Sequence, residues 1–473
     1  MNRFDPNSYK DLADDAAMIQ AAVDAAAESG ETVVVPRYNE RRGEALWDIP
    51  RAIGLHSGSV VCLDNCVLRL ADDVFDNMFR NSNYETPAVF TREGRQVDIR
   101  VYGLGNAVLC GGRQNGHTEA TQRGEDKRPM YYNSFFNFMN CERITVENLR
   151  MIEQRYWAFT FHYCSKGRIS NIDFYAPWTA PNQDGIDLRT GCSDFIIENI
   201  TGVTGDDVVA LTCLRSRYDD AMKATALDDS IHHVTIRNIR AATVFSLVRL
   251  LNHGGKLLHD ILIENITETA EHDPAHERCR DYPPLDEAAA KYRSGSLVRI
   301  GENGYNGTTR KAEVDETFNV VVRGVQSRAR TAIRVSNALN NALFEDIQLY
   351  GDGGTAVYFV EGHVKNISVS NVGYSMAHSP CPTDDNRIEG PFNNRTKAND
   401  PISPDRKLGV IYFKETVAEN LLFDNIRASR HNTAVFAGNG QVTMAAANVI
   451  REDPDTPLID PDLRAEKIKT DEF

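Results

Sequence analysis

The sequence predicts an all-β chain that coils into a right-handed parallel β-helix, with an N-terminal helical cap and long loop insertions. The first observation is a repeated phrase of alternating apolar and polar residues that closes on an asparagine and an aliphatic residue. Copies end at Asn148-Leu149, Asn171-Ile172, Asn199-Ile200, Asn238-Ile239 and Asn265-Ile266. The second observation is the spacing, because the most regular copies follow one another after 22 to 28 residues. Short strands at such a period are typical of a solenoid, with alternate residues inside and outside and the asparagines stacked at one corner.

The first element in chain order is a helix, predicted over Asp14–Ser29. This segment is dense in alanine, places its larger apolar residues on one helical face, and meets a stop signal at Gly30. A strand over Thr32–Val35 follows. We interpret residues 1–36 as a cap that covers the open end of the stacked sheets. An ordinary first β-α unit is the alternative.

Residues 37–441 are predicted to form the coils of a single β-helix domain that spans residues 1–473. Weaker copies of the phrase close at Gly324-Val325, Asp346-Ile347, Asn371-Val372 and Asn425-Ile426. The repeat is interrupted by three insertions, at 213–229, 271–294 and 375–406. We expect at least the first two to rim a cleft, because insertions in solenoids often wall the binding face. The pattern fades after about Val442, so residues 442–473 are interpreted as an end cap or packed tail.

The composition restricts the class of protein and its partners. The chain has 473 residues, of which 41% are hydrophobic and 25% charged, and its net charge is −15. This charge disfavours nucleic acid and anionic membranes as partners, and no apolar run is long enough to span a bilayer. Oligomerisation stays open. Because Met1–Lys10 lacks an apolar core, we expect a cytoplasmic protein as given, or a secreted or periplasmic one if a signal has been removed.

The cysteines and histidines give little reason to expect a metal or a cofactor. Nine cysteines without close pairing are expected to be reduced and mostly buried, and three of them precede strand-like segments, Cys141, Cys164 and Cys192. His272, His276 and Cys279 have a spacing that suits zinc, but no fourth ligand is near, so we expect a solvated loop. Aspartates beside a β-helix cleft are candidate calcium ligands. We expect no cofactor and no resident metal.

Three acidic residues in the stretch Ala176–Leu211 are the candidates for catalysis. Asp184 lies in the segment NQDGID, and Asp206 and Asp207 lie in GDD. Asp184 and Asp206 are 22 residues apart, which suits one coil, and neighbouring coils are about 4.8 Å apart. Carboxylates held together raise one another's proton affinity, so that one can stay protonated while another stays ionised. A glycosidase needs this combination, an acid for the leaving oxygen and a base for the water. The alternative is that the three are turn residues at coil corners.

The same stretch resembles glycoside hydrolase family 28, the polygalacturonase family. The resemblance rests on Asn182-Gln183-Asp184-Gly185-Ile186-Asp187, on a strand that closes at Asn199, and on Gly205-Asp206-Asp207 followed by small and apolar residues. Tyr156-Trp157 sits where the family usually has an aromatic residue. The first helix and strand are similar to those that open the β-helices of the pectate-lyase-like superfamily.

This resemblance implies the roles of the three candidates. Asp206 is then the general acid, and Asp184 and Asp207 orient and deprotonate the attacking water. The resemblance also implies inversion at the anomeric carbon, for which acid and base are expected to lie roughly 6.5–9.5 Å apart to admit a water. We interpret Asp187 as structural, pointing away from the cleft.

Two positions depart from the family pattern. In place of the family's Gly-His-Gly the chain has Ala242–Leu247 without a histidine, and His253 in the following turn is the nearest substitute. A surface turn histidine is the alternative. The family's Arg-Ile-Lys, which binds a uronate carboxylate, appears as Arg299-Ile300-Gly301, so one of two cations is lost. Arg249 is a candidate source of further charge, or else a solvated or structural arginine.

The remaining candidates for substrate binding are Asn182 and a group of aromatic side chains. These aromatic residues are Tyr156, Trp157, Trp178 and Tyr305. Each is a candidate platform for sugar stacking, and a core or turn position is the alternative for each.

Together these features predict an inverting, exo-acting hydrolase of pectin-derived or related oligosaccharides. The long insertions and the apparent absence of an export signal favour exo action on short substrates. Three alternatives stay open. The first is a β-helix that binds carbohydrate without cleaving it, which the missing histidine and lysine favour. The second is a lyase, which would need a lysine near the acidic stretch. The third is a glycosyl-transferring enzyme, which would yield different products.

Overall fold

The computed structural model describes residues 3–118, 121–122, 127–176, 182–213, 223–243, 245–269, 296–301, 312–327, 331–349, 354–374, 409–466 and 470–471. The chain forms two compact units. The first comprises Met1–Asp206 and Arg215–Val234, and the second comprises Asp207–Leu214 and Thr235–Phe473. One boundary therefore falls between the neighbouring residues Asp206 and Asp207. Another lies inside strand β17 (Ile231–Thr243).

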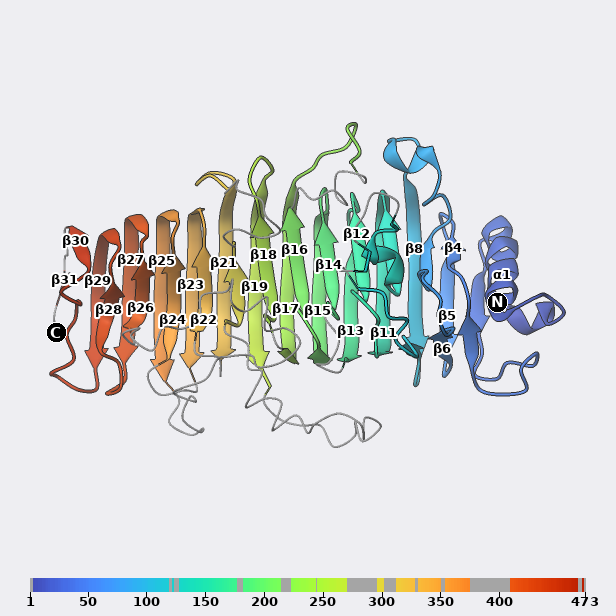
Figure 1. The fold of residues 1–473 in the computed structure, drawn as a ribbon, viewed down its shortest axis with the longest axis horizontal. Coiled ribbons are helices and arrows are strands. Elements are labelled where there is room, and N and C mark those ends of the chain that lie inside the picture. The colour runs from blue at the N-terminus through green and yellow to red at the C-terminus, as the bar shows by residue number, and fades with distance from the viewer. Residues whose placement is uncertain are drawn as a thin grey trace. The chain divides into compact units, whose positions relative to one another are not determined.

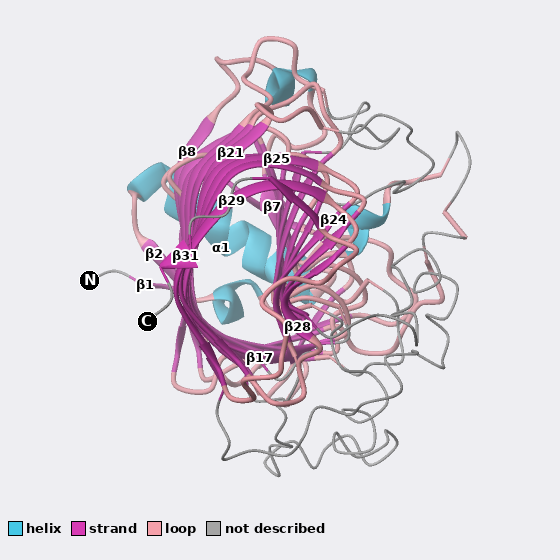
Figure 2. Ribbon diagram, turned by 90° about the vertical axis from the view of Figure 1, so that its left-hand side faces the viewer, coloured by secondary structure: helices cyan, strands magenta, loops and turns pink. Residues whose placement is uncertain are grey.

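The first unit begins with the predicted helix, α1 (Asp15–Ser29). The Asp14 side chain accepts a hydrogen bond from the backbone N–H of Ala17 (2.8 Å), and Gly30 ends the helix in the left-handed conformation (φ 73°). Buried alanines and larger apolar residues of α1 face β2, β3 and β4. Figures 1 and 2 show α1 at the N-terminal end of the unit, between the strands of its two sheets, so the predicted helical cap is confirmed.

The first unit stacks its strands in two parallel ladders. The first sheet contains β1 (Arg3–Phe4), β2 (Thr32–Val35), β3 (Trp47–Ile49), β5 (Val60–Asp64), β6 (Val67–Leu70), β8 (Gln96–Leu104), β9 (Val108–Cys110), β11 (Cys141–Ile152), β13 (Arg168–Tyr175) and β15 (Ser193–Thr204). The second sheet contains β4 (Ile53–Leu55), β7 (Phe79–Asn81), β10 (Phe136–Met139), β12 (Phe159–His162) and β14 (Ile186–Arg189). Short 3-10 helices occur at η1 (Pro6–Tyr9), η2 (Pro87–Phe90) and η3 (Met130–Asn133).

The second unit repeats this arrangement. Its part of the first sheet contains β19 (Leu258–Glu268), β21 (Thr317–Ser327), β23 (Leu339–Leu349), β25 (His363–Tyr374), β27 (Val417–Ala428), β29 (Gln441–Arg451), β30 (Arg464–Glu466) and β31 (Thr470–Asp471). Its part of the second sheet contains β16 (Val209–Cys213), β18 (Val248–Asn252), β20 (Val298–Ile300), β22 (Thr331–Ser336), β24 (Thr355–Val360), β26 (Gly409–Lys414) and β28 (Ala434–Gly438). The pairings are parallel throughout both ladders, which confirms the predicted parallel β-helix.

The repeated asparagines form the predicted ladder at the bends of the long strands. In the first unit Asn171 donates its side-chain amide to Asn148 and Asn199 donates to Asn171, both at 2.9 Å. In the second unit Asn265 donates to Asn238 at 3.2 Å. All five residues have positive φ, between 55° and 59°. Asparagine tolerates this left-handed conformation better than most residues, which explains why the phrase closes on it.

The interior of the first unit is a stack of aromatic and small residues. The ring of Phe136 lies 5.3 Å from that of Phe79 and 4.9 Å from that of Phe159, centre to centre. The three cysteines that precede strands, Cys141, Cys164 and Cys192, are buried and form no disulfide. Their prediction as small interior residues is therefore confirmed.

The ends and insertions differ in part from the prediction. Strand β29 pairs in parallel with β27, and β30 and β31 pair with β29. That residues 442–473 form an end cap or packed tail stays a prediction. The insertions 271–294 and 375–406 lie outside the described residues, as do 214–222 of the first insertion and residues His272, His276 and Cys279. Whether the chain is one domain stays a prediction. In the part of the chain that the structure describes, no helix is both long and apolar enough to cross a bilayer.

Candidate active site

Asp184 lies in the turn that leads into β14. The backbone N–H of Ala158 donates to the carbonyl oxygen of Asp184 (3.0 Å), and Phe159 donates to Gly185 (2.9 Å). These bonds begin the pairing of β12 with β14, so the ladder itself fixes the turn. Asn182, two residues earlier, is buried and has a φ of 60°. Asparagine tolerates this left-handed conformation better than most residues, which explains its presence in the turn. Its predicted contact with substrate stays a prediction.

Asp206 follows the end of β15 and is tied to the same turn. Gly205 donates its N–H to the carbonyl oxygen of Gln183 (3.0 Å), and the hydroxyl of Thr204 donates to the carbonyl oxygen of Asp206 (2.5 Å). One carboxylate oxygen of Asp184 and one of Asp206 lie within 4.8 Å of each other, and the next residue, Asp207, offers a third oxygen within the same limit. Within the first unit the structure thus brings Asp184 and Asp206 together, and Asp207 follows Asp206 directly in the chain.

The side chains of the three candidate acids are buried. The relative exposures of Asp184, Asp206 and Asp207 are 5%, 3% and 0%, so water has little access to them. The expected separation of roughly 6.5–9.5 Å between the acid and base carboxyl groups stays a prediction. One oxygen of Asp184 and one of Asp206 lie within 4.8 Å of each other. A single water can still hydrogen-bond to two oxygens at this spacing, because each bond spans about 2.8 Å. Carboxylate oxygens so arranged are also able to hold a cation.

Asp207 is positioned within the second unit by the loop before β18. Val208 and Val209 donate backbone N–H groups to Ser246 (3.0 Å) and Leu247 (3.1 Å). The Ser246 hydroxyl donates to Oδ1 of Asp207. Ser246 belongs to the segment Ala242–Leu247, so a hydroxyl from this segment contacts Asp207. Nothing in the sequence pointed to this contact, because it depends on the register between two coils.

Arg249 forms an ion pair with Asp207. Its Nη1 lies 3.1 Å from Oδ2 of Asp207, and the two side chains are 10% and 1% exposed. A buried carboxylate is strongly destabilising without a nearby opposite charge, and Arg249 supplies that charge. The arginine is therefore not a solvated one. Its first role is to compensate Asp207, and direct contact with substrate stays a prediction.

Arg299 and His253 are both buried in the second unit. Arg299 is the middle residue of β20 and pairs in register with Arg249 of β18. Its neighbours Val298 and Ile300 are fully buried in the core, so Arg299 is on the outer face of the second sheet. His253 follows the end of β18, is 3% exposed and donates its backbone N–H to Cys213 (3.4 Å). The alternative of a surface turn histidine is therefore wrong.

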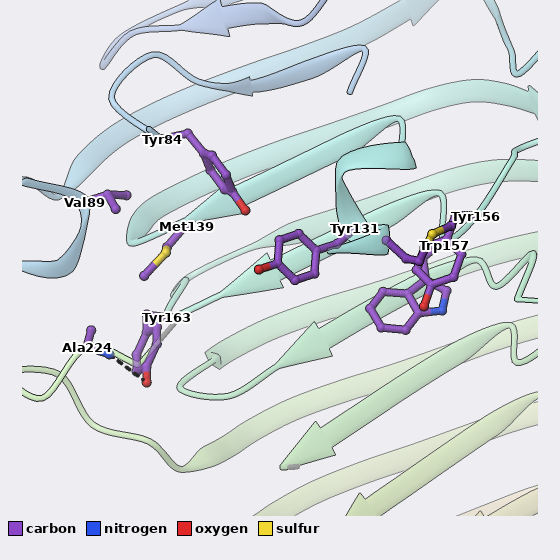
Figure 3. Close-up of a cluster of buried hydrophobic side chains, with 9 residues drawn as sticks. Tyr84, Val89, Tyr131, Met139, Tyr156, Trp157, Tyr163 and Ala224 are labelled. Carbon is purple, nitrogen blue, oxygen red and sulfur yellow. Dashed lines mark hydrogen bonds between the residues drawn. The ribbon is translucent and has the colours of Figure 1, made fainter. Parts of the chain in front are cut away.

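The predicted aromatic platforms that the structure describes belong to a buried cluster, shown in Figure 3. Tyr156 and Trp157 pack against each other with ring centres 4.5 Å apart, and Trp157 is 8% exposed. This favours a core position over a stacking platform for both. The guanidinium carbon of Arg189 lies 4.7 Å from the Trp157 ring centre, a contact that the sequence did not suggest. Trp178 and Tyr305 lie outside the described residues.

Asp187 shares the outer face of β14 with Arg189. It pairs in register with Thr160 of β12, and its neighbours Ile186 and Leu188 are fully buried in the core. Asp187 is itself only 1% exposed, which is consistent with a structural role. That role was expected from the sequence and stays a prediction.

Comparison with known proteins places the three aspartates in a recognisable segment. The model of the family described as glycosyl hydrolases family 28 matches residues 81–224. Residues 81–224 therefore resemble family 28 glycosyl hydrolases. A probable polygalacturonase from Arabidopsis thaliana is 34% identical over 74 residues, which is 16% of this chain and 16% of the plant protein. The sequence similarity thus covers about one sixth of the plant relative's length.

Similar solved structures support the fold. The tailspike protein of E. coli bacteriophage HK620, solved as a mutant in complex with a pentasaccharide, has a TM-score of 0.56 at 12% identity. The match covers 97% of this chain and 77% of that one. A family 28 exopolygalacturonase from Yersinia enterocolitica has a TM-score of 0.49 at 12% identity, covering 99% and 78% of the two chains. At such identities the likeness concerns the fold alone, which is a right-handed parallel β-helix.

Proposed function

We propose that the protein is a polygalacturonase-like glycoside hydrolase that cleaves O-glycosyl bonds in pectin-derived or related oligosaccharides. The observation that carries the proposal is the approach of the Asp184 and Asp206 carboxylates to within 4.8 Å, inside the segment that resembles family 28. Two acidic groups at this distance can hold one water between them, and glycosidic cleavage needs both a proton donor and an activated water.

In the proposed reaction Asp206 acts as the general acid. Its carboxyl proton passes to the glycosidic oxygen as the bond between that oxygen and the anomeric carbon breaks. A water held by Asp184 and Asp207 gives up a proton to a carboxylate and bonds to the anomeric carbon from the opposite face, so the configuration inverts. The low exposure of all three side chains supports this proposal, because charges act more strongly where water is excluded.

The test is hydrolysis of an oligosaccharide panel by the wild type, Asp206→Asn and Asp184→Asn. Loss of a general acid or base lowers the rate by about 10²–10⁴-fold, so both variants should fall by at least 100-fold. Asp194→Asn is a matched control, because Asp194 is an exposed residue of β15 with a φ of 57° that asparagine readily adopts. It should keep wild-type activity. Equal activity in Asp206→Asn and wild type would refute the assigned acid.

A second candidate function is carbohydrate binding without cleavage. It is favoured by the contacts of Asp207, since Ser246 and Arg249 approach its two carboxylate oxygens and the family histidine is absent. The same panel separates the two candidates. Binding of an oligosaccharide by the wild type, with no reducing ends released from any member of the panel, would favour this second function. New glycosidic bonds instead of free reducing ends would indicate transfer.

We also propose that cleavage proceeds from a chain end. The support comes from the sequence, in which the insertions 271–294 and 375–406 are long, and insertions of this kind often close one end of a binding site. Product analysis over time tests the proposal. Exo action on a long oligomer releases one short product from the first minutes onward. An early ladder of intermediate lengths would show endo action.

A further inference from the structure

The second unit carries a groove on the outer face of its first sheet. The groove has a volume of about 610 Å³ and crosses the adjacent strands β19, β21, β23 and β25, which follow one another in Figure 1. A volume of this size is typical of ligand sites, which hold about 300–1,000 Å³. None of the described residues that line the groove belongs to the candidate active site, since Asp207 precedes β16 of the second sheet.

Asparagine side chains form one side of the groove. Asn319, Asn341 and Asn366 lie on successive strands with φ between 52° and 55°. Asn341 donates from Nδ2 to Oδ1 of Asn319 (2.7 Å), and Asn319 donates to Asp260 (2.8 Å). Asn366 donates to Asn340 (2.9 Å). Each of the three amides thus gives one N–H to a ladder, and a side-chain amide carries two. Within the described part of the chain the second N–H of each has no protein acceptor, so it is left for a ligand.

Aliphatic side chains form the other side of the groove. Leu262, Val321 and Leu343 are paired in register on successive strands, and Ser368 continues the row on β25. All four are partly exposed, because their neighbours along each strand point into the core. Successive strands are about 4.8 Å apart, so the row is about 14 Å long from the first strand to the fourth. The groove therefore offers hydrogen-bond donors along one side and apolar surface along the other.

The lining excludes several classes of ligand. No lysine, arginine or histidine is among the described residues that line the groove, and Asp260 adds a carboxylate. A phosphate or a uronic acid would therefore meet no cation there. Strands β21 and β23 are paired with a neighbour on both sides, so a peptide cannot add to them as a further strand. These described residues also include no aromatic ring, unlike the grooves that bind proline-rich segments.

A neutral sugar chain suits both sides of the groove. Sugar rings carry hydroxyl groups at their rims, and a hydroxyl accepts a hydrogen bond from an amide N–H while it keeps its own proton to donate. The C–H faces of the rings are apolar, so they are removed from water by contact with aliphatic side chains. The spacing of the asparagines at one per strand repeats this combination along the groove.

We propose that this groove is a second carbohydrate site, which binds a neutral polysaccharide without cleaving it. The amides of Asn341 and Asn366 donate to hydroxyl groups of the bound chain, and Leu343 contacts a C–H face. The inference goes beyond the proposed hydrolase and does not depend on it, because it assigns a ligand to residues outside the candidate active site.

The test is affinity electrophoresis of the full chain in gels that contain soluble galactan, arabinan or xyloglucan, with polygalacturonate as a charged comparison. All proteins carry Asp206→Asn, so that no polymer is cut. At least one neutral polymer should retard the protein. Leu343→Asp places a charge in the apolar row and should weaken that affinity at least 10-fold. Leu422→Asp is the matched control and should change the affinity less than 2-fold, because Leu422 continues the same row on β27, is 51% exposed and does not line the groove.

A second pair of variants tests the amides. Asn341→Gly removes one amide, and glycine keeps the positive φ without strain, so the affinity for the neutral polymer should fall about 3- to 10-fold. Asn371→Gly is its control, because Asn371 has a φ of 55° and donates to Asp346 in the other ladder. It should leave the affinity unchanged.

The outcomes decide the inference without reference to hydrolysis. Retardation by none of the three neutral polymers would overturn it, and so would equal affinities in Leu343→Asp and Leu422→Asp. A loss of affinity in Leu343→Asp that is as large for polygalacturonate as for the neutral polymer would also overturn it, since the groove carries no cation for an acid. If Leu343→Asp fails to fold, the comparison of Asn341→Gly with Asn371→Gly decides, because equal affinities in these two would contradict the proposed contacts.

Discussion

Replacing Arg249 by methionine tests whether the buried charge of Asp207 depends on its partner. Methionine keeps much of the apolar volume of the arginine stem and removes only the charged end. Of the two side-chain contacts described above, Asp207 then keeps the hydrogen bond from the Ser246 hydroxyl and loses the ion pair with Arg249. The Asp207 side chain is 1% exposed, so solvent cannot replace the lost guanidinium.

The expected loss follows from this burial. Removing one member of a buried ion pair costs about 3–5 kcal/mol, because the other charge stays buried without compensation. For a folding unit of this size, each kcal/mol lowers the melting temperature by about 2–4 °C, so a fall of about 6–20 °C is expected. An exposed pair gives a matched control. Arg323→Met breaks the contact with Glu264, where the Arg323 side chain is 47% exposed, and should lower the melting temperature far less than Arg249→Met.

Urea unfolding of a double-mutant cycle measures the interaction itself. The cycle comprises the wild type, Arg249→Met, Asp207→Asn and the double variant. Asparagine removes the charge that Arg249 compensates, so the second substitution should cost less in the Arg249→Met background than in the wild type. A coupling energy of about 0.5–3 kcal/mol is expected for groups in direct contact. A free energy of unfolding for Arg249→Met within about 0.5 kcal/mol of wild type, or a cycle without coupling, would refute the reasoning.

Three further predictions concern the ladder, the crowded glycine and a half-buried acid. Asn171→Ala should lower the free energy of unfolding by about 2 kcal/mol through strain at positive φ and lost amide bonds. Asn171→Gly should lower the free energy of unfolding by less than Asn171→Ala, because glycine adopts positive φ without strain. Equal losses of free energy in the two variants would show that backbone strain plays no part. Gly301→Lys should destabilise the second unit, since its Cβ would meet the Ser336 carbonyl oxygen; a variant with the melting temperature of the wild type would contradict this. Burial raises the pKa of Glu153, so the native state favours its neutral form and loses stability as pH rises through that pKa. Glu153→Gln should therefore melt at a higher temperature than wild type at pH 7, with the difference vanishing below the ordinary pKa of glutamic acid; a constant difference would contradict the pKa shift.

The fold was predictable because its signal is local and repeated. Each long strand closes on an asparagine whose left-handed conformation and side-chain ladder are visible in the sequence as one recurrent phrase. The proximity of Asp184 and Asp206 followed from their separation by one coil. Both inferences needed only the period of the coil and no knowledge of how distant segments align.

The rest of the site depends on register between coils of unequal length. Arg249 and Arg299 are in register although they are 50 residues apart, a separation that does not match the regular period. The contact of Ser246 with Asp207 depends on a loop that carries none of the residues expected there. The burial of His253 and Trp157 is likewise set by segments far along the chain, so the sequence left their exposure open.

The most direct measurement is a crystal structure of the Asp206→Asn variant with an uncleaved uronic acid oligosaccharide. We predict a glycosidic oxygen about 3 Å from the side chain at position 206 and a sugar ring next to Asp184. An oligosaccharide bound on another face, with no sugar ring next to Asp184 and Asp207, would contradict the account.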